Sequence, residues 1–268
     1  MLLVVACAVP STYLTGRLLF WPLGQGTLQL TDSTITVLYL RIEQMSRQPF
    51  ITFEGSEACG KTTQVRRLAA RLDRLRVPHL ITREPGGTPI GESIRELLQF
   101  APHNSNMAPE TELLLFEASR SQLVREVIKP ALARGMCVIA DRFFDSTTVY
   151  QGAARKLDRQ MVERFNAFAV GDCIPDMTIV LDVDAATAEL RMRQEQRKPD
   201  RMERQPAEFH ERVRKGYHDL AAREPERIIL IDASHDADAI ERHIWKKLSS
   251  RFTVFERTAN SEQRTANN

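Results

Sequence analysis

Residues 55–63, GSEACGKTT, are the most informative part of this chain about its fold. They fit the pattern G-x-x-x-x-G-K-[ST] and lie between an apolar run that ends at Glu54 and a segment with helical periodicity. Gly55 and Gly60 allow the backbone to turn tightly, so that successive N–H groups can point at phosphate oxygens. The helix that begins near Lys61 adds the positive end of its dipole. The sequence therefore predicts a phosphate-binding loop between a strand and a helix.

Five short apolar runs predict the strands of one sheet. They are rich in Ile and Val and each ends at a polar or acidic residue; they span residues 49–54, 78–83, 136–141, 177–182 and 227–232. Runs that are apolar on both faces suit a buried parallel sheet, and helical patterns lie between them. The longest helical pattern begins near Pro109 and stops at Gly135. We expect an α/β fold, the three-layer P-loop NTPase fold with a five-stranded parallel sheet flanked by helices.

Composition limits the classes of protein to which the chain can belong. Of its 268 residues, 43% are apolar, enough to bury a sizeable core, and a net charge of +2 argues against bulk nucleic-acid binding. Four widely separated cysteines form no C-x-x-C pair, which suggests neither a zinc site nor a disulfide framework. This cysteine usage favours the reduced cytoplasm.

One domain is expected, over residues 45–253. Residues 1–44 read as an extension that is disordered or lies upstream of a true start at Met45. The extension begins with the apolar stretch MLLVVACAVP, which is too short to span a bilayer, so no membrane association is predicted. Residues 254–268 read as a polar tail.

The loop residues are predicted to bind ATP with Mg²⁺. The predicted contacts are Gly55, Ser56, Glu57, Ala58, Cys59, Gly60, Lys61 and Thr62. Lys61 would reach the β- and γ-phosphates and act in catalysis, while the Thr62 hydroxyl would ligate the metal. The chain has no NKxD motif of a switch GTPase, and its third strand ends in Asp141 followed by Arg142 rather than in an acidic pair. A cation beside the metal-organising carboxylate Asp141 suggests that a second anion binds close by.

Arginines and polar groups outline that second site. Arg83 and Arg142 follow the second and third strands, so both lie at the edge of the sheet that carries the loop. Arg120 lies four residues after Phe116 and shares its helix face, although Phe116 taken alone reads better as a core residue. If residues 143–152 are helical, hydroxyl, amide and aromatic groups share one face and could read a nucleobase and sugar. These groups belong to Ser146, Thr147, Tyr150 and Gln151.

Several blocks together resemble the thymidylate kinase family. They are FEGSEACGKTTQ, TREPGGTPIGESIRELL, ELLLFEASRSQLVREVIKPAL, VIADRFFDSTTVYQG and PDMTIVLDV, in family order from about Phe50 to Arg251. The resemblance implies transfer of the γ-phosphoryl group of ATP to dTMP, with Mg²⁺ and without a strong general base. It also implies a homodimer with the helix that carries Phe116 near the interface.

The resemblance further implies a role for each acceptor-site residue. Phe116 would stack on thymine, Arg120 would contact the base edge, and Arg83 and Arg142 would hold the dTMP phosphate. Asp141 would organise Mg²⁺ or its waters. Ser146, Thr147 and Gln151 match positions near the base, and Tyr150 one near the deoxyribose. Glu57 would meet the sugar 3′-hydroxyl or lie near the metal.

Residues 191–207 fall where nucleoside monophosphate kinases carry a lid. The segment and the start of the next helix contain Arg191, Arg193, Arg197, Arg201, Arg204 and Arg212. Such a charge run is usually a solvated helix. Family members without a basic residue inside the phosphate loop supply one from the lid, and residues 56–59 contain none. This implies that Arg193, Arg197 or Arg201 acts as a catalytic arginine finger.

Two loop positions depart from the family pattern, which more often has Gly-Ala where this chain has Ala58 and Cys59. Ala58 must have ordinary backbone angles or be slightly strained, and Cys59 is expected to be a reactive thiol that ATP protects. Other readings stay open: a kinase for another nucleoside monophosphate or a deoxynucleoside, or an ATP-binding regulator without turnover.

Overall fold

The structure, a computed structural model, describes residues 48–101, 104–194 and 200–255. The chain divides into two units, Met1–Ile42 and Glu43–Asn268, and all of the described residues belong to the second. The predicted extension at residues 1–44 and most of the predicted tail lie outside the described residues, as does Arg197. Within the described residues, no helix is both long and apolar enough to cross a membrane.

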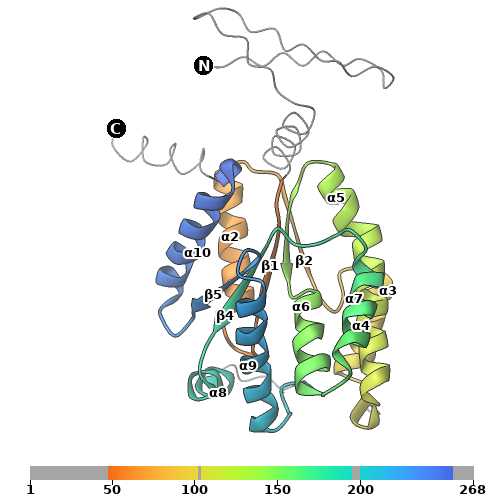
Figure 1. The fold of residues 1–268 in the computed structure, drawn as a ribbon. Helices are drawn as coiled ribbons and strands as arrows, with labels where there is room; N and C mark the ends of the chain where they lie inside the picture. The colour runs from red at the N-terminus through yellow and green to blue at the C-terminus, as the bar shows by residue number, and fades with distance from the viewer. Residues whose placement is uncertain (1–47, 102–103, 195–199, 256–268) are drawn as a thin grey trace, which may run out of the picture. The chain divides into compact units, whose positions relative to one another are not determined.

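The predicted five-stranded sheet is confirmed, and every neighbouring pair of strands is parallel. Its strands are β1 (Phe50–Gly55), β2 (His79–Arg83), β3 (Cys137–Asp141), β4 (Met177–Asp182) and β5 (Ile228–Asp232). They lie side by side in the order β2-β3-β1-β4-β5 (Figure 1). This order brings the carboxyl ends of β1, β2 and β3 together, where an open parallel sheet binds its ligands.

The register of the strands sets the positions of two predicted site residues. Asp141 pairs with Phe53 of β1 on one side and with Arg83 of β2 on the other. Strand β1 ends at Gly55, two residues after Phe53, and the phosphate loop starts there. Arg142 follows Asp141 directly, so the prediction that Arg83 and Arg142 lie at the same edge of the sheet as the phosphate loop is confirmed.

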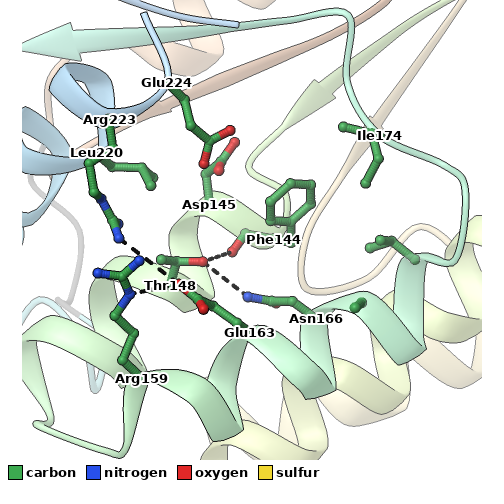
Figure 2. Close-up of a pocket in the computed structure, with 12 residues that line it drawn as sticks. Phe144, Asp145, Thr148, Arg159, Glu163, Asn166, Ile174, Leu220, Arg223 and Glu224 are labelled. Atoms are coloured by element: carbon green, nitrogen blue, oxygen red, sulfur yellow. Dashed lines mark hydrogen bonds and ion pairs between the residues drawn. The ribbon is translucent and has the colours of Figure 1, made fainter.

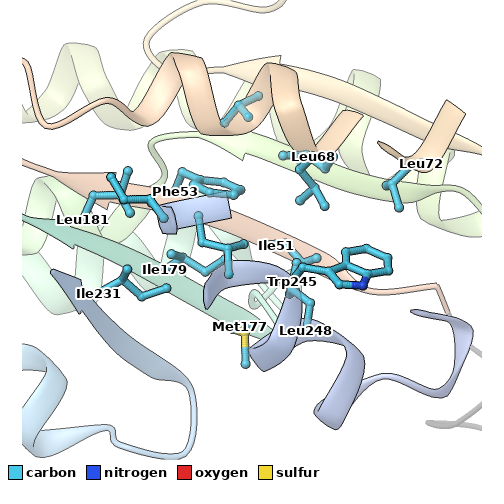
Figure 3. Close-up of a cluster of buried hydrophobic side chains, with 14 of the residues drawn as sticks. Ile51, Phe53, Leu68, Leu72, Met177, Ile179, Leu181, Ile231, Trp245 and Leu248 are labelled. Carbon is cyan, nitrogen blue, oxygen red and sulfur yellow. The ribbon is translucent and has the colours of Figure 1, made fainter. Parts of the chain in front are cut away.

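Helices α2 (Lys61–Arg74) and α10 (Ala237–Arg251) cover one face of the sheet (Figure 1). Their apolar stripes close a core with alternate strand residues such as Ile51, Phe53 and Ile179 (Figure 3). Leu68 and Leu72 enter this core from α2, at the helical spacing predicted from the sequence. Phe255, two residues beyond the predicted domain boundary, is buried in the same core and packs on Trp245.

A second group of helical segments covers the other face of the sheet. Phe50 and Val138 pack against α4 (Pro109–Leu123) and the helical turns after it, η2 (Val124–Ile128) and α5 (Lys129–Ala133). Val180 packs against α9 (Ala207–Arg223). Between them run α6 (Phe144–Thr147) and η3 (Thr148–Ala154), while α7 (Arg159–Val170) packs against α4 and η3. Helix α3 (Pro89–Gln99) packs on α4, the short η1 (Asn104–Asn106) follows α3, and α8 (Ala185–Gln194) follows β4.

Two predicted helices contain wider π turns. The long helix from Pro109 is confirmed, but it passes through the π segment η2 just before Pro130. Proline has no N–H and its ring would clash with the carbonyl of Glu126 in a regular helix, so a wider turn accommodates it. The helix considered for residues 143–152 is present over 144–154, but the π segment η3 occupies its second half. π turns are frequent at functional sites.

Candidate active site

The phosphate loop has the strained backbone that its sequence requires. Gly55 has φ 132°, and a Cβ there would meet the carbonyl oxygen of Leu181 at 2.4 Å. Gly60, at the N-terminus of α2, has φ 95°. Ala58 has φ 53°, so of the two expected alternatives this position is the strained, left-handed one. A left-handed alanine is held only where its surroundings over-determine it, which marks this loop as a functional site.

Lys61 and Thr62 begin α2 and turn toward the loop and β3. The Lys61 ammonium donates to the carbonyl oxygens of Gly55 (3.1 Å) and Ser56 (2.6 Å) and is buried. Thr62 Oγ1 donates to Asp141 Oδ2 at 2.6 Å, so the two predicted metal ligands are together. Hydroxyl and carboxylate oxygens are the donor type that Mg²⁺ prefers. The described residues hold no group of three or more His, Cys, Asp or Glu that could enclose an ion, so a metal here would complete its shell with phosphate oxygens and water.

Arg142 is the centre of the acceptor side. Its backbone is left-handed, with φ 73°, a strained conformation for a residue with a side chain. The guanidinium donates to Gly55 O (3.1 Å), Ser146 Oγ (3.1 Å), Glu57 Oε1 (3.2 Å) and Tyr150 Oη (3.2 Å). These contacts join the phosphate loop to α6 and η3, so Arg142 links the donor side of the site to its acceptor side.

The Glu57 side chain points toward these acceptor-side groups. Its Oε1 accepts from Tyr150 Oη at 2.7 Å, and its Oε2 lies 3.5 Å from His210 Nδ1 on α9. Burial opposes ionisation of Glu57, but contact with His210 and the charges of Arg142 and Lys61 outweigh burial and lower its pKa to about 2. Glu57 is thus a fixed negative charge at the junction of the two sides.

A second buried carboxylate, Glu54, lies 4.0 Å from Arg142 and shares Ser146 with it as a hydrogen-bond partner. Glu54 Oε2 accepts from Ser146 Oγ at 2.6 Å and from Tyr217 Oη at 2.8 Å, and Oε1 accepts from the backbone N–H of Phe143 at 2.7 Å. Burial raises the pKa of Glu54, although the positive charge of Arg142 acts to lower it. Ser146, predicted to lie near the base, belongs to this network and contacts Arg142 as well.

Arg83 extends from β2 into the loop REPGGT, residues 83–88. Its guanidinium binds both carboxylate oxygens of Glu92, at 2.9 and 3.0 Å, and half of the side chain is exposed. Arg95 lies one turn further along α3, and its pKa is lowered by burial and by the charge of Arg83. Arg83 is thus paired with a carboxylate, and its contact with a substrate phosphate stays a prediction.

Arg120 lies in a different environment from the one predicted. Only 1% of the residue is exposed, and its donors bind Glu84 (2.8 Å), Glu117 (2.6 Å), Asn166 (3.2 Å) and the carbonyl oxygen of Phe143 (3.4 Å). Burial raises the pKa of Glu84 to about 7 even beside Arg120. The face shared with Phe116 therefore puts Arg120 inside the wall of the site, and its contact with a base edge stays a prediction.

The four polar residues of 146–151 divide into two pairs rather than sharing one face. Ser146 and Tyr150 turn toward Arg142, as described above. Thr147 and Gln151 are buried, and the Gln151 amide donates to Glu112 Oε1 on α4 at 2.7 Å. The physical reason is that residues four apart align on a helix, whereas adjacent residues diverge. Thr147 Oγ1 has no hydrogen-bond partner among the described residues.

Comparison with known proteins agrees with this arrangement. The family model described as Thymidylate kinase matches residues 53–244. A thymidylate kinase of Geobacter sulfurreducens is 50% identical over 196 residues, which cover 71% of this chain and 91% of the relative. The chain belongs to the thymidylate kinase family. A thymidylate kinase of Deinococcus radiodurans is 44% identical over 207 residues, which cover 77% of this chain and 99% of that protein.

The fold agrees as well. The crystal structure of a thymidylate kinase from Ehrlichia chaffeensis is 36% identical and superimposes with a TM-score of 0.61. The match covers 75% of this chain and 98% of the other. The resemblance to the thymidylate kinase family inferred from the sequence blocks is therefore confirmed.

Within this thymidylate kinase fold, Cys59 is not the reactive thiol that its position predicted. The side chain is fully buried in the core between α2 and the sheet, and its sulfur lies 3.4 Å from the Lys61 ammonium. A thiol without exposed surface is not presented to reagents, so the expected ATP-protected inactivation is not supported. Cys59 instead packs beneath the loop.

The predicted lid arginines occupy contrasting environments. Arg193, near the end of α8, is exposed and pairs with Glu189 one turn earlier. Arg201 is buried, donates to Leu98 O at 3.0 Å and pairs with Glu112 Oε2 at 2.5 Å. Arg197 lies outside the described residues. Catalysis by a lid arginine stays a prediction, and Arg201 would have to leave Glu112 in order to act.

One hollow among the described residues is a groove away from the phosphate loop. It has a volume of about 330 Å³ and lies between α6, α7 and the end of α9 (Figure 2). Phe144, Ile174 and Leu220 line it, and the Asn166 amide donates to Thr148 Oγ1 at 3.0 Å beside it. None of the predicted site residues lines this groove, so its volume gives no reason to place the nucleotide there.

Four residues of the site were not singled out from the sequence: Glu54, Glu112, His210 and Tyr217. Glu54 was read only as the end of a strand. His210 and Tyr217 lie seven residues apart on α9, so they share one face, and that spacing was the available signal. The carboxylates that they meet, Glu57 and Glu54, are more than 150 residues away in the chain, so no local pattern indicated these contacts.

Proposed function

We propose that this chain transfers the γ-phosphoryl group of ATP to dTMP and so produces dTDP and ADP. An oxygen of the dTMP phosphate forms a bond to the γ-phosphorus as the bond from that phosphorus to the β,γ-bridging oxygen breaks. The bridging oxygen and its electron pair leave with ADP. The attacking oxygen is already anionic, so positioning and charge neutralisation replace a general base.

One observation carries this proposal: the consecutive residues Asp141 and Arg142 point into opposite halves of the site. Asp141 binds Thr62 of the donor loop, and Arg142 binds Glu57, Ser146 and Tyr150 on the other side. A single turn after β3 thereby sets the distance between a site for ATP and a site for a second anion. Hydrolysis of ATP alone would need no second cluster of this kind.

The donor half would hold ATP through the loop N–H groups and Lys61. The left-handed backbone at Gly60 and Ala58 turns the loop around the space where the β-phosphate would lie. Lys61 would exchange its contacts with loop carbonyls for the β- and γ-phosphates. Thr62 and Asp141 would hold Mg²⁺ or its waters, and that ion would neutralise charge that develops on the phosphate oxygens.

The acceptor half would hold dTMP at three points. Arg83 and Arg142 would bind its phosphate, and Arg95 beside Arg83 strengthens that positive region. Phe116 would stack on thymine from α4. Glu57 would accept from the sugar 3′-hydroxyl while Tyr150, already bound to Glu57, lies beside the deoxyribose.

A lid arginine would complete the charge neutralisation. Its rate contribution is about 10³-fold or more, as for arginine fingers in other phosphoryl transferases. We expect replacement of Arg193, Arg197 or Arg201 by Ala, each in turn, to identify it by a loss in kcat. Near-normal kcat values for all three variants would contradict a lid finger.

A second copy of this chain is the partner that we propose. Apolar side chains are exposed on three helices that pack side by side: Ile90, Leu97 and Phe100 in or next to α3, Leu114 on α4, and Met161 and Phe168 on α7. Phe168 is 78% exposed. Exposed apolar groups gathered on neighbouring helices indicate an interface. The interface would contain α4, the helix that carries Phe116.

The remaining proposals concern location and other partners. We place the chain in the cytoplasm, because the three described cysteines are free and buried and the proposed substrates are free nucleotides. We propose neither a nucleic-acid nor a membrane partner, since the net charge is only +2.

A coupled assay of ADP release tests the proposed function. Purified chain is given MgATP with dTMP, dUMP, dGMP, dCMP or AMP in parallel, and kcat/KM is measured for each. We expect the highest kcat/KM with dTMP. A higher value with another monophosphate would indicate a different kinase, and no stimulation by any of them would favour a non-catalytic ATP-binding protein.

A further inference from the structure

We propose that Glu112 is a positioning residue for base selection: it fixes the side-chain amide of Gln151 with the carbonyl oxygen turned toward the nucleobase. The inference rests on the proposed function and deepens it, because it assigns the selection of the pyrimidine to a residue that does not touch the substrate. The inference is drawn from a buried carboxylate on α4 that is surrounded by three donor residues: Gln151 and Arg155 in or next to η3, and Arg201 in the segment before α9.

Glu112 has both carboxylate oxygens occupied. Oε1 accepts from Gln151 Nε2 at 2.7 Å and from Arg155 Nε at 3.3 Å. Oε2 accepts from Arg155 Nη2 at 3.2 Å and pairs with Arg201 Nη2 at 2.5 Å. Only 1% of Glu112 is exposed, so water does not compete for these contacts.

The two arginines are themselves held in place. Arg201 Nε donates to Leu98 O at 3.0 Å, Arg155 Nη1 donates to Gln205 Oε1 at 2.9 Å, and the Arg155 guanidinium lies over the Phe209 ring at 4.8 Å. Burial opposes ionisation of Glu112, but the Gln151 hydrogen bond and the charges of Arg201 and Arg155 outweigh it and lower the pKa of Glu112. Glu112 is therefore a fixed, ionised acceptor.

A carboxylate of this kind permits one orientation of the amide. An ionised carboxylate can only accept hydrogen bonds, whereas a glutamine amide has one end that donates and one that accepts. With the NH₂ group toward Glu112, both partners are satisfied. Rotation of the amide by 180° would bring two acceptor oxygens together in a buried site, which is costly. The Gln151 carbonyl oxygen must then serve another donor.

The nucleobase supplies that donor if it is thymine or uracil. Both carry an N3–H, which can donate to the Gln151 carbonyl oxygen, while cytosine has an unprotonated acceptor at N3. Phe116, the proposed stacking residue, lies four residues after Glu112 and so follows it on the same face of α4. A site built to accept from one base rejects an analogue that lacks the donor far more strongly than an apolar pocket would.

The test compares kcat/KM for dTMP and dCMP in the full-length chain and its variants. Glu112→Gln replaces the obligate acceptor with a group that can present either end, so Gln151 can turn over. We expect the preference for dTMP over dCMP to fall about 10-fold or more, through KM for the nucleoside monophosphate. KM for ATP should change little. Glu110→Gln makes the same chemical change on an exposed residue of the same helical turn and should keep the wild-type preference.

Two further variants keep the result decisive. Glu112→Asp retains the charge beside Arg155 and Arg201 but withdraws the carboxylate from Gln151 by one methylene. It should therefore also lower the preference for dTMP over dCMP, and it serves as the test variant if Glu112→Gln fails to fold. In a Gln151→Ala background, Glu112→Gln should not lower the preference further. A folded Glu112→Asp or Glu112→Gln enzyme with unchanged preference would overturn the proposal, whereas a wild-type chain that does not phosphorylate dTMP would overturn the proposed function instead.

Discussion

The guanidinium of Arg142 lies 3.2 Å from the carboxylate of Glu57, Nη2 to Oε1, although the two residues are 85 positions apart. This pair explains why a loop shaped for phosphates contains an acidic residue. The backbone of the loop is proposed to bind ATP, whereas the Glu57 side chain turns toward Arg142 and Tyr150. The loop therefore contributes to both halves of the site.

Glu57→Ala should affect the acceptor more than the donor. A hydrogen bond to a charged group is worth about 1.5–3 kcal/mol, which corresponds to a rise of about 10- to 100-fold in KM for dTMP. KM for MgATP should rise much less, since the loop backbone is retained. Steady-state kinetics with each substrate varied in turn measures both constants. A larger rise for ATP than for dTMP would refute the acceptor-side role.

The activity should depend on Mg²⁺ held by Asp141 and Thr62. Activity should disappear with excess EDTA and return with Mg²⁺. Asp141→Asn keeps the hydrogen-bonding shape but removes the charge, so the Mg²⁺ concentration for half-maximal activity should rise by about 10- to 100-fold. Titration of activity with Mg²⁺ at saturating substrates provides the measurement, with exposed Asp238→Asn as the control. An unchanged Mg²⁺ requirement would exclude Asp141 from the metal site.

His210 should make stability depend on pH on the alkaline side. Contact with Glu57 raises the pKa of His210 above its ordinary value, although burial opposes this. The ion pair therefore contributes fully below pH 6.5 and is lost as the pH rises through the raised pKa; Glu57, with a pKa of about 2, stays ionised throughout. His210 is partly exposed, so the pair is worth about 1 kcal/mol or less, a Tm difference of about 2–4 °C at most.

The measurement for His210 is the difference in Tm between wild type and His210→Gln from pH 5.5 to pH 9. The wild type should be more stable at the acidic end, and the two curves should converge as the pH rises. His235→Gln, at an exposed histidine, serves as the matched control. A difference that is constant over the whole range would show that protonation of His210 is not involved.

Arg120→Leu should destabilise the fold rather than only weaken base binding. The substitution leaves the buried carboxylates of Glu84 and Glu117 without their cation, and breaking such a pair costs about 3–5 kcal/mol. The loss should be smaller at pH 5, where carboxylates with raised pKa are protonated, than at pH 8. Urea unfolding at both pH values measures it. If the Arg120→Leu variant has normal stability and a raised KM for dTMP, Arg120 instead contacts the base directly.

Phe168→Glu should separate the proposed dimer. A charge at the centre of an apolar interface removes a contact worth about 2 kcal/mol or more and leaves the new carboxylate buried in the complex. Sedimentation velocity over a range of concentrations should show a dimer for the wild type and a monomer for the variant. Lys246→Glu, on α10, introduces a charge on a different helix and should leave the dimer intact. A monomeric wild-type chain would contradict the proposal directly.

Local patterns in the sequence were sufficient for the fold. Each strand was found within one residue of its observed ends, because runs that are apolar on both faces occur where a parallel sheet is covered by helices. The glycine loop, Lys61 and Thr62 were found for a similar reason: their chemistry depends on spacing along one turn of chain. The blocks shared with thymidylate kinases identified the family.

The amino-acid pattern is thus enough to specify the sheet, the phosphate loop and the family. Which buried side chains meet depends on packing: Arg120 pairs with Glu84, Cys59 lies in the core, and Gln151 binds Glu112. The physical reason is that buried charges and amides must find partners wherever the packed chain brings them, 36 residues away for Glu84 and 39 for Glu112. Periodicity reports the face on which a residue lies, and packing decides what that face contacts.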